Sequence, residues 1–195
     1  MPPHTFRALL CACLLPSALG AADNLIFNGG FELGTAGYEL TKNLRPSTNP
    51  NYVFEGVSID TTTKASGSCS LRYPNKYAEF SQLFLRGVKL KPATTYTFSL
   101  SAKSDVAAIT VQALIVCDDY NGDNGAPFSV GQSWQRYSVS FTTPALKIPG
   151  DPNPPSGSQL SSRAVYIRLN SGTTGTVWLD DIQLVEGDAT AFVPS

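Results

Sequence analysis

Two apolar segments near the ends of the chain carry acidic and amide side chains that the interior of a strand would normally exclude. The first is residues 24–32 (NLIFNGGFE) and the second is residues 177–184 (VWLDDIQL). Asp and Asn are depleted in strands, and a carboxylate beside a hydrophobic core is costly unless it is paired. A shared cation or a hydrogen-bond network between the two segments would keep these polar groups in place.

The second segment also predicts an irregularity in its own strand. Leu179 and Ile182 would face opposite sides of a regular strand, yet both are apolar and belong in a core. A β-bulge at Asp180 and Asp181 would bring both onto one side and turn one carboxylate outward.

The first segment, which closes on Gly34, and the second, which continues as W-L-D-D-I-Q-L-x-E-G, resemble the motifs of CenC-type carbohydrate-binding modules. The resemblance covers most of the chain after residue 23 and implies a galactose-binding-like jelly roll. It also implies a structural Ca²⁺ between the first and last strands, with Glu32 and Asp181 at the matching positions. Oxygens of the Ser66–Gly67 turn and of the Asn28 region would complete the shell. Solvated acids at strand ends are the alternative.

The acidic residues of the chain could support catalysis by a pair of carboxyl groups. The only histidine, His4, lies in the expected signal peptide, so Ser-His-Asp, Cys-His and histidine–zinc chemistry are not expected of the mature chain. Glycoside hydrolysis needs only two carboxyl groups, about 5–9 Å apart. A small glycoside hydrolase or lyase that pairs Glu79 with Asp118 or Asp119 is therefore an alternative function.

Carbohydrate recognition needs flat aromatic rings for the apolar faces of sugars and polar side chains for their hydroxyls. Several tyrosines, glutamines and charged residues stand in turns or on the polar sides of expected strands. The candidates for stacking are Tyr38, Tyr77 and Tyr120, and those for reading hydroxyls are Gln82, Gln112, Asp118 and Arg168. In the resembled modules, glutamines at comparable strand positions contact sugar hydroxyls, whereas a Trp usually stands where this chain has Tyr38. Packing or a solvated strand face is the alternative for each residue.

Short strands must position these side chains, because β-branched and aromatic runs recur between turn residues and no stretch has the pattern of a long amphipathic helix. The pattern predicts an all-β sandwich of jelly-roll type. Strands are expected at 25–27, 52–60, 68–73, 78–85, 88–90, 95–101, 109–117, 135–142, 164–169 and 176–185. In residues 95–101 apolar and polar residues alternate, which predicts one buried face and one partly polar face.

The ends of the chain predict its processing and domain boundaries. Residues 1–22 combine a basic start, a short apolar run and small residues, which is typical of a secretory signal peptide cleaved after Gly20 or Ala22. Residues 23–188 would form the sandwich, and residues 189–195 a linker or tail. Secretion would permit a disulfide between Cys69 and Cys117, and two buried free thiols are the alternative.

The formal net charge is −1, with no basic patch and no apolar run of about 20 residues, so neither nucleic acid nor a membrane span is expected. The sequence predicts a secreted module that binds polysaccharide or oligosaccharide without catalysis and is attached to a glycoside-degrading enzyme in a longer chain. A structural or adhesion spacer domain of a cell-surface protein is the other alternative.

Overall fold

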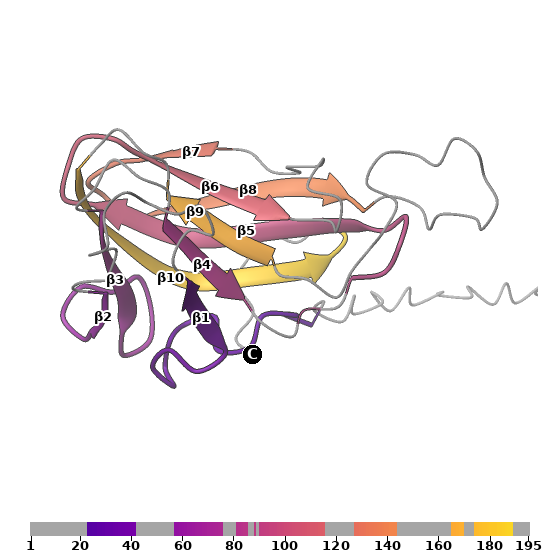
Figure 1. Ribbon diagram of the computed structural model, residues 1–195, viewed down its shortest axis with the longest axis horizontal. Coiled ribbons are helices and arrows are strands. Elements are labelled where there is room, and N and C mark those ends of the chain that lie inside the picture. The colour runs from indigo at the N-terminus through magenta and orange to yellow at the C-terminus, as the bar shows by residue number, and fades with distance from the viewer. Residues whose placement is uncertain are drawn as a thin grey trace, which may run out of the picture.

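The computed structural model describes residues 23–41, 57–75, 81–85, 88, 90–115, 127–143, 165–169 and 174–188. Within these ranges every regular element is a β-strand, and the strands form two packed layers (Figure 1). The expected signal peptide, the C-terminal tail and the proline-rich stretch at 144–162 lie outside the described residues. No helix in the described ranges is long and apolar enough to cross a membrane.

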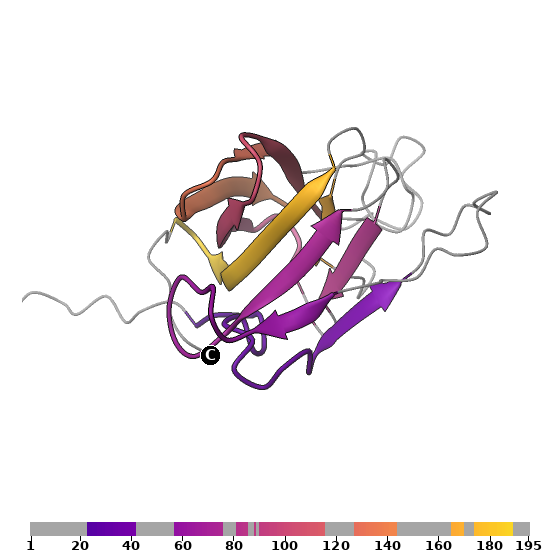
Figure 2. The ribbon, with the colours of Figure 1, turned by 90° about the vertical axis from the view of Figure 1, so that its left-hand side faces the viewer.

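Each layer is a five-stranded antiparallel sheet, and Figure 2 shows the layers from one end of the molecule. The first sheet runs in the order β1 (Tyr38–Thr41), β4 (Ser81–Leu85), β9 (Val165–Leu169), β6 (Ile109–Ile115) and β7 (Pro127–Val130). The second runs in the order β2 (Ser58–Asp60), β3 (Ser70–Asn75), β10 (Gly175–Glu186), β5 (Thr95–Ser104) and β8 (Gln135–Thr142). The predicted all-β jelly-roll sandwich is confirmed.

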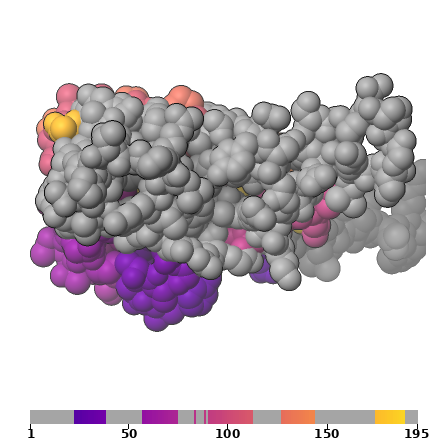
Figure 3. All heavy atoms as spheres, in the orientation of Figure 1, coloured from indigo at the N-terminus to yellow at the C-terminus, as the bar shows by residue number. Residues whose placement is uncertain are grey.

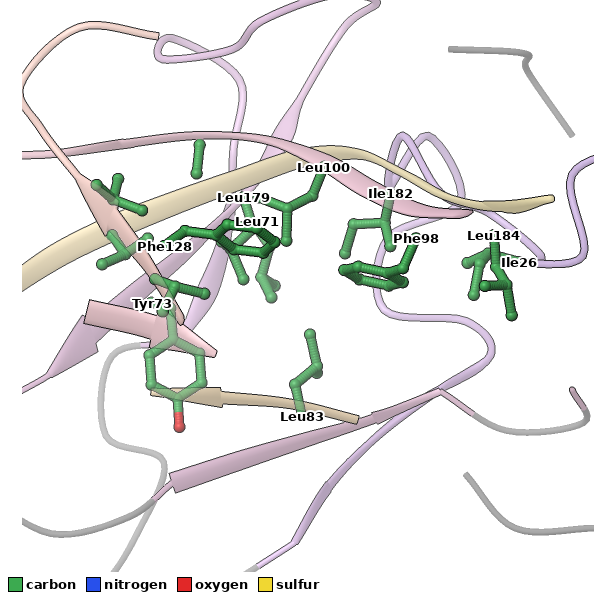
Figure 4. Packing of buried hydrophobic residues seen from close by; sticks show 14 of the residues in the cluster. Ile26, Leu71, Tyr73, Leu83, Phe98, Leu100, Phe128, Leu179, Ile182 and Leu184 are labelled. Carbon is green, nitrogen blue, oxygen red and sulfur yellow. The ribbon is translucent and has the colours of Figure 1, made fainter. Parts of the chain in front are cut away.

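The hydrophobic core fills the space between the two sheets. Leu71, Leu100 and Leu179 of the second sheet are fully buried, and Leu83 of the first sheet is 2% exposed. Figure 4 shows Leu83 approaching this cluster from the opposite layer. Since side chains alternate along a strand, these buried positions fix which residues of each sheet face outward.

The second face of residues 95–101 is polar, as predicted, but it is buried as well. Phe98 and Leu100 face the core as predicted, but Thr97 and Ser99 on the other side are only 1% and 0% exposed. Their hydroxyls have partners: Thr97 Oγ1 donates to the Gly187 carbonyl at 2.6 Å, and Arg136 donates to Ser99 Oγ at 2.7 Å. Buried hydroxyls with such partners avoid most of the cost of desolvation.

Most expected strands form, with shifted ends, but residues 25–27 do not, and residues 88 and 90 lie outside the strands. The chain at 25–27 runs beside β10 and begins a series of turns. There the Asn24 side chain takes over the pairing: its Oδ1 accepts from Leu184 N at 3.0 Å and its Nδ2 donates to the Ile182 carbonyl at 3.2 Å. Strands β1 and β7, of four residues each, were not predicted because such short runs carry little periodicity.

Candidate functional site

The two polar segments lie side by side, as the sequence predicts. Leu25 N donates to the Leu184 carbonyl and Ile182 N donates to the Gly29 carbonyl, both at 2.8 Å. The approach at Gly29 is so close that an added Cβ would overlap the Ile182 carbonyl oxygen. Glycine at this position therefore allows the N-terminal segment to lie against β10. Figure 3 shows the N-terminal segment packed beside residues 57–75.

The predicted β-bulge is also confirmed. The register of β10 against β5 shifts between Asp180 and Gln183, and Asp181 has a φ of 49°. The bulge buries both Leu179 and Ile182 completely. The Asp181 carboxylate turns to the outer side of the sheet, where the Ser101 hydroxyl donates to it, but it is covered there: Asp181 is 6% and Asp180 is 0% exposed.

Both buried carboxylates are covered by the loop that precedes β3. Asp180 Oδ2 accepts hydrogen bonds from the backbone amides of Ala65 at 2.9 Å and Ser66 at 3.2 Å. Asp181 accepts from the Ser66 hydroxyl through Oδ1 and from the Ser101 hydroxyl through Oδ2. Burial, the largest influence, raises the pKa of Asp180 to about 6.

Arg136 of β8 closes the other side of the bulge. Its guanidinium donates to the Asp181 carbonyl at 2.6 Å and to Ser99 Oγ at 2.7 Å. Burial lowers the pKa of Arg136, while the charges of Asp181 and Asp180 act in the opposite direction. The sequence does not reveal this role, because residues 136 and 181 are neighbours only through the pairing of β8, β5 and β10.

The other predicted metal residues gather around the same loop, with one exception. Glu32 Oε1 accepts from Ser68 N at 2.8 Å, and a Cβ at Gly67 would overlap that carboxylate oxygen. The Asn28 amide instead holds its own turn: its Oδ1 accepts from Leu33 N and its Nδ2 donates to the Gly34 and Ala36 carbonyls. The Asn28 carbonyl is engaged as well, because it accepts from Phe31 N and from the Tyr38 hydroxyl.

The donor chemistry suits Ca²⁺, which prefers carboxylate and carbonyl oxygens. Among the described side chains, however, no group of three Asp, Glu, His or Cys residues is placed to hold a metal ion. Glu32 and Asp181 instead bond to positions two residues apart on one loop, Ser68 and Ser66. These two carboxylates could serve an ion together with loop carbonyls, in exchange for their present hydrogen bonds.

Three of the predicted carbohydrate-binding residues form one row across the first sheet. Gln82 of β4 is in register with Arg168 of β9, and Arg168 is in register with Gln112 of β6. Their chain neighbours Leu83 and Val111 are 2% and 0% exposed, which places the row on the outer face of the sheet. Gln112 is half-buried.

An aromatic pair that the sequence analysis did not select lies beside this row. Phe84 of β4 is in register with Tyr166 of β9. Each of them is two residues away from a member of the row on its own strand, Gln82 on β4 and Arg168 on β9. Since side chains alternate along a strand, the pair is on the same face as the row. The sequence alone indicates that Gln82 and Phe84 face the same side of their strand, because they are two residues apart. The same holds for Tyr166 and Arg168. What was missing was the pairing between the two strands.

Tyr38 is not part of that row. Its ring stacks on the buried Phe31 at a centroid distance of 4.7 Å, and its hydroxyl donates to the Asn28 carbonyl at 3.1 Å. Burial, the largest influence, raises the pKa of Tyr38. Both the ring and the hydroxyl thus take part in packing the N-terminal segment.

The remaining predicted residues are placed as follows. Cys69 is a buried thiol whose Sγ donates to the Phe31 carbonyl at 3.1 Å, and its burial raises its pKa. The pairing of Cys69 with Cys117 stays a prediction, because Cys117 lies outside the described residues. Other predicted residues lie outside the described ranges: Tyr77, Glu79, Cys117, Asp118, Asp119 and Tyr120.

The polar row and the aromatic pair have the composition of a sugar-binding surface. A family profile described as a carbohydrate binding domain (CBM_4_9) matches residues 23–150. The chain belongs to this carbohydrate-binding family. The matched part includes the N-terminal segment, Gln82 and Gln112, whereas Arg168 and β10 follow it.

Similar proteins agree with this fold. The tRNA nuclease WapA of Bacillus subtilis is 24% identical over 187 residues, which are 89% of this chain but only 7% of that protein. A solved structure titled Family 16 Carbohydrate Binding Module-2 has a TM-score of 0.54 and 21% identity, covering 84% of this chain and all of that one. The CBM22-1 xylan-binding domain of Paenibacillus barcinonensis Xyn10C has a TM-score of 0.55 and 17% identity, covering 87% and 97%.

Proposed function

We propose that this domain binds polysaccharide without catalysis, on the outer face of the sheet β1-β4-β9-β6-β7. The register that aligns Gln82, Arg168 and Gln112 on adjacent strands is the observation that supports this site. Glutamine amides both donate and accept, as paired sugar hydroxyls require, and the neighbouring Phe84 and Tyr166 supply rings for stacking.

Affinity electrophoresis in gels that contain soluble polysaccharides tests the site. The wild-type chain is expected to be retarded by at least one glycan, without release of reducing ends. Gln82→Ala and Gln112→Ala should each weaken binding by about fivefold, the effect of one lost hydrogen bond. Gln135→Ala, an exposed glutamine on the second sheet, is the matched control. Equal binding by all four proteins would refute the site.

The resemblance to CenC-type modules supports a finer assignment, a secreted module that holds a longer chain on its polysaccharide. The chain spans about 7% of the length of the curated relatives it matches. An enzymatic activity in a fused domain is therefore part of this proposal. Tethering needs only modest affinity, because it raises the local concentration of the attached domain. N-terminal sequencing of exported protein should find cleavage after Gly20 or Ala22; an intact N-terminus would contradict secretion by this signal.

A structural Ca²⁺ between Glu32, Asp181 and carbonyls of the Ser66–Gly67 loop is the second part of the proposal. Two features support it: the carboxylates meet one loop, and their oxygens suit Ca²⁺. Such an ion would join the N-terminal segment to the last strand.

The Tm measured with and without Ca²⁺ tests whether this ion binds. Exhaustive chelation should lower the Tm of the wild-type chain, and added CaCl₂ should restore it, because an ion that binds only the folded state stabilises that state. The variant Glu32→Gln should lose most of this response. A melting curve that chelation leaves unchanged would exclude the ion.

A further inference from the structure

One arginine position lies in the middle of the outer face of the first sheet. Among the outward positions of the described strands in this sheet, the charged residues are Arg168 and Glu39. Arg168 lies on β9, the central strand, and the residues in register with it on both neighbouring strands are uncharged glutamines.

Glu39 is remote from this position. Glu39 on β1 is in register with Phe84 on β4, and Phe84 is in register with Tyr166 on β9. Glu39 is therefore two strands away from β9, at the level of Tyr166, which is two residues from Arg168. Strand spacing and rise place the two Cα atoms roughly 12 Å apart. The row Gln82–Arg168–Gln112 therefore contributes a net positive charge flanked by amides.

A guanidinium differs from an amide in what it recognises. It has five N–H donors in a planar fork and accepts nothing, so it matches the two oxygens of a carboxylate far better than a single sugar hydroxyl. The flanking glutamines can donate to the same carboxylate or exchange hydrogen bonds with the hydroxyls beside it. Phe84 and Tyr166, one outward position away, provide the apolar contact that a pyranose ring needs.

We propose that the polysaccharide bound by this face is acidic, with the carboxylate of a uronic acid residue seated on Arg168. The inference rests on the proposed function. It differs in the sugar group that Arg168 binds, which is a carboxylate instead of a neutral hydroxyl.

The test compares acidic polysaccharides with their own neutral derivatives. Polygalacturonate, alginate and glucuronoxylan are each presented in native form and after chemical reduction of the carboxyl groups to alcohols, and binding is measured by affinity electrophoresis. At least one native polymer should bind about tenfold or more tightly than its reduced form, the effect of a charge-assisted hydrogen bond. Raising the NaCl concentration should reduce that advantage.

Two variants and one control assign the effect to the arginine. Arg168→Gln should abolish the preference for the native form, while Arg168→Lys, which keeps the charge but loses the fork, should retain part of it. Lys103→Gln removes the same charge from the outer side of the second sheet and should leave the preference intact. Circular dichroism confirms that each variant is folded.

The outcomes separate this inference from the proposed function. If reduced and native polymers bind equally and Arg168→Gln weakens both, the domain binds neutral glycan and the uronate assignment is overturned. A native preference that survives in Arg168→Gln also overturns it. If the wild-type chain binds neither form of these polymers nor any neutral glycan, the proposed function fails as well.

Discussion

At the scale of single residues, Asp60 shows how one carboxylate organises a turn. Its Oδ1 accepts from Thr62 N at 2.8 Å and Thr63 N at 3.0 Å, and its Oδ2 accepts from the Trp178 indole at 2.8 Å. The side-chain hydrogen bonds from Thr62 and Trp178, with help from the backbone amides, lower the pKa of Asp60. The ionised carboxylate thus links the end of β2 to β10.

Asp60→Asn should destabilise the protein near neutral pH by about 1 kcal/mol, a value limited by solvent screening. Because the folded-state pKa is depressed, ionised Asp60 contributes its full stability above about pH 4 and loses it as the pH falls further. The difference between wild type and variant should therefore shrink toward zero at low pH. Urea unfolding at a series of pH values measures it, and a difference that does not change with pH would contradict the assignment.

At the scale of elements, one side chain supplements the two main-chain hydrogen bonds that attach the N-terminal segment to β10. Asn24 Oδ1 accepts from both Ile26 N and Leu184 N at 3.0 Å, while its Nδ2 donates to the Ile182 carbonyl at 3.2 Å. The amide thus resembles a peptide group inserted beside the strand. A carboxylate could accept as well but could not donate to Ile182.

Asn24→Ala should lower the free energy of unfolding by about 2 kcal/mol, because partly buried main-chain groups of β10 lose their partners. Asn24→Asp should also destabilise, since its oxygen would face the Ile182 carbonyl. Asp23→Ala, at the exposed neighbouring position, is the control and should change stability little. Chemical denaturation compares the three. Stability equal to wild type in Asn24→Ala would show that Asn24 does not hold this segment.

At the scale of the whole molecule, the last two described strands occupy the middle of the two sheets. β9 pairs with β4 and β6, and β10 pairs with β3 and β5. Without them, the remaining described strands form four separate pairs: β1 with β4, β6 with β7, β2 with β3, and β5 with β8. The family match, which ends at residue 150, thus leaves out both central strands.

A fragment of residues 23–150 should fail to fold, since isolated two-stranded pairs are marginal in water. A fragment of residues 23–188 retains both central strands and should unfold cooperatively, with a Tm close to that of residues 23–195. Circular dichroism and the dispersion of amide proton chemical shifts in NMR spectra distinguish the folded fragment from the unfolded one. Cooperative unfolding of residues 23–150 would contradict the central role of β9 and β10.

The candidate sites were predictable to different degrees. The bulge followed from Leu179 and Ile182, because two apolar residues three positions apart cannot both reach one face of a regular strand. The resemblance placed the Ser66–Gly67 turn beside Asp181, but the contact from Arg136, a residue distant in sequence, was not predicted. Gln82, Gln112 and Arg168 were named from the chemistry of their side chains, with no means to tell whether they meet.

By itself the sequence determined the class of fold, most strands and the inward residues, because apolar alternation and turn residues act over a few neighbouring positions. Only the tertiary structure decided which outward residues share a row. The register of β4, β9 and β6 joins residues 82, 168 and 112 through packing and ladder hydrogen bonds among distant segments. A shift of one residue in that register would turn the same side chains toward the core.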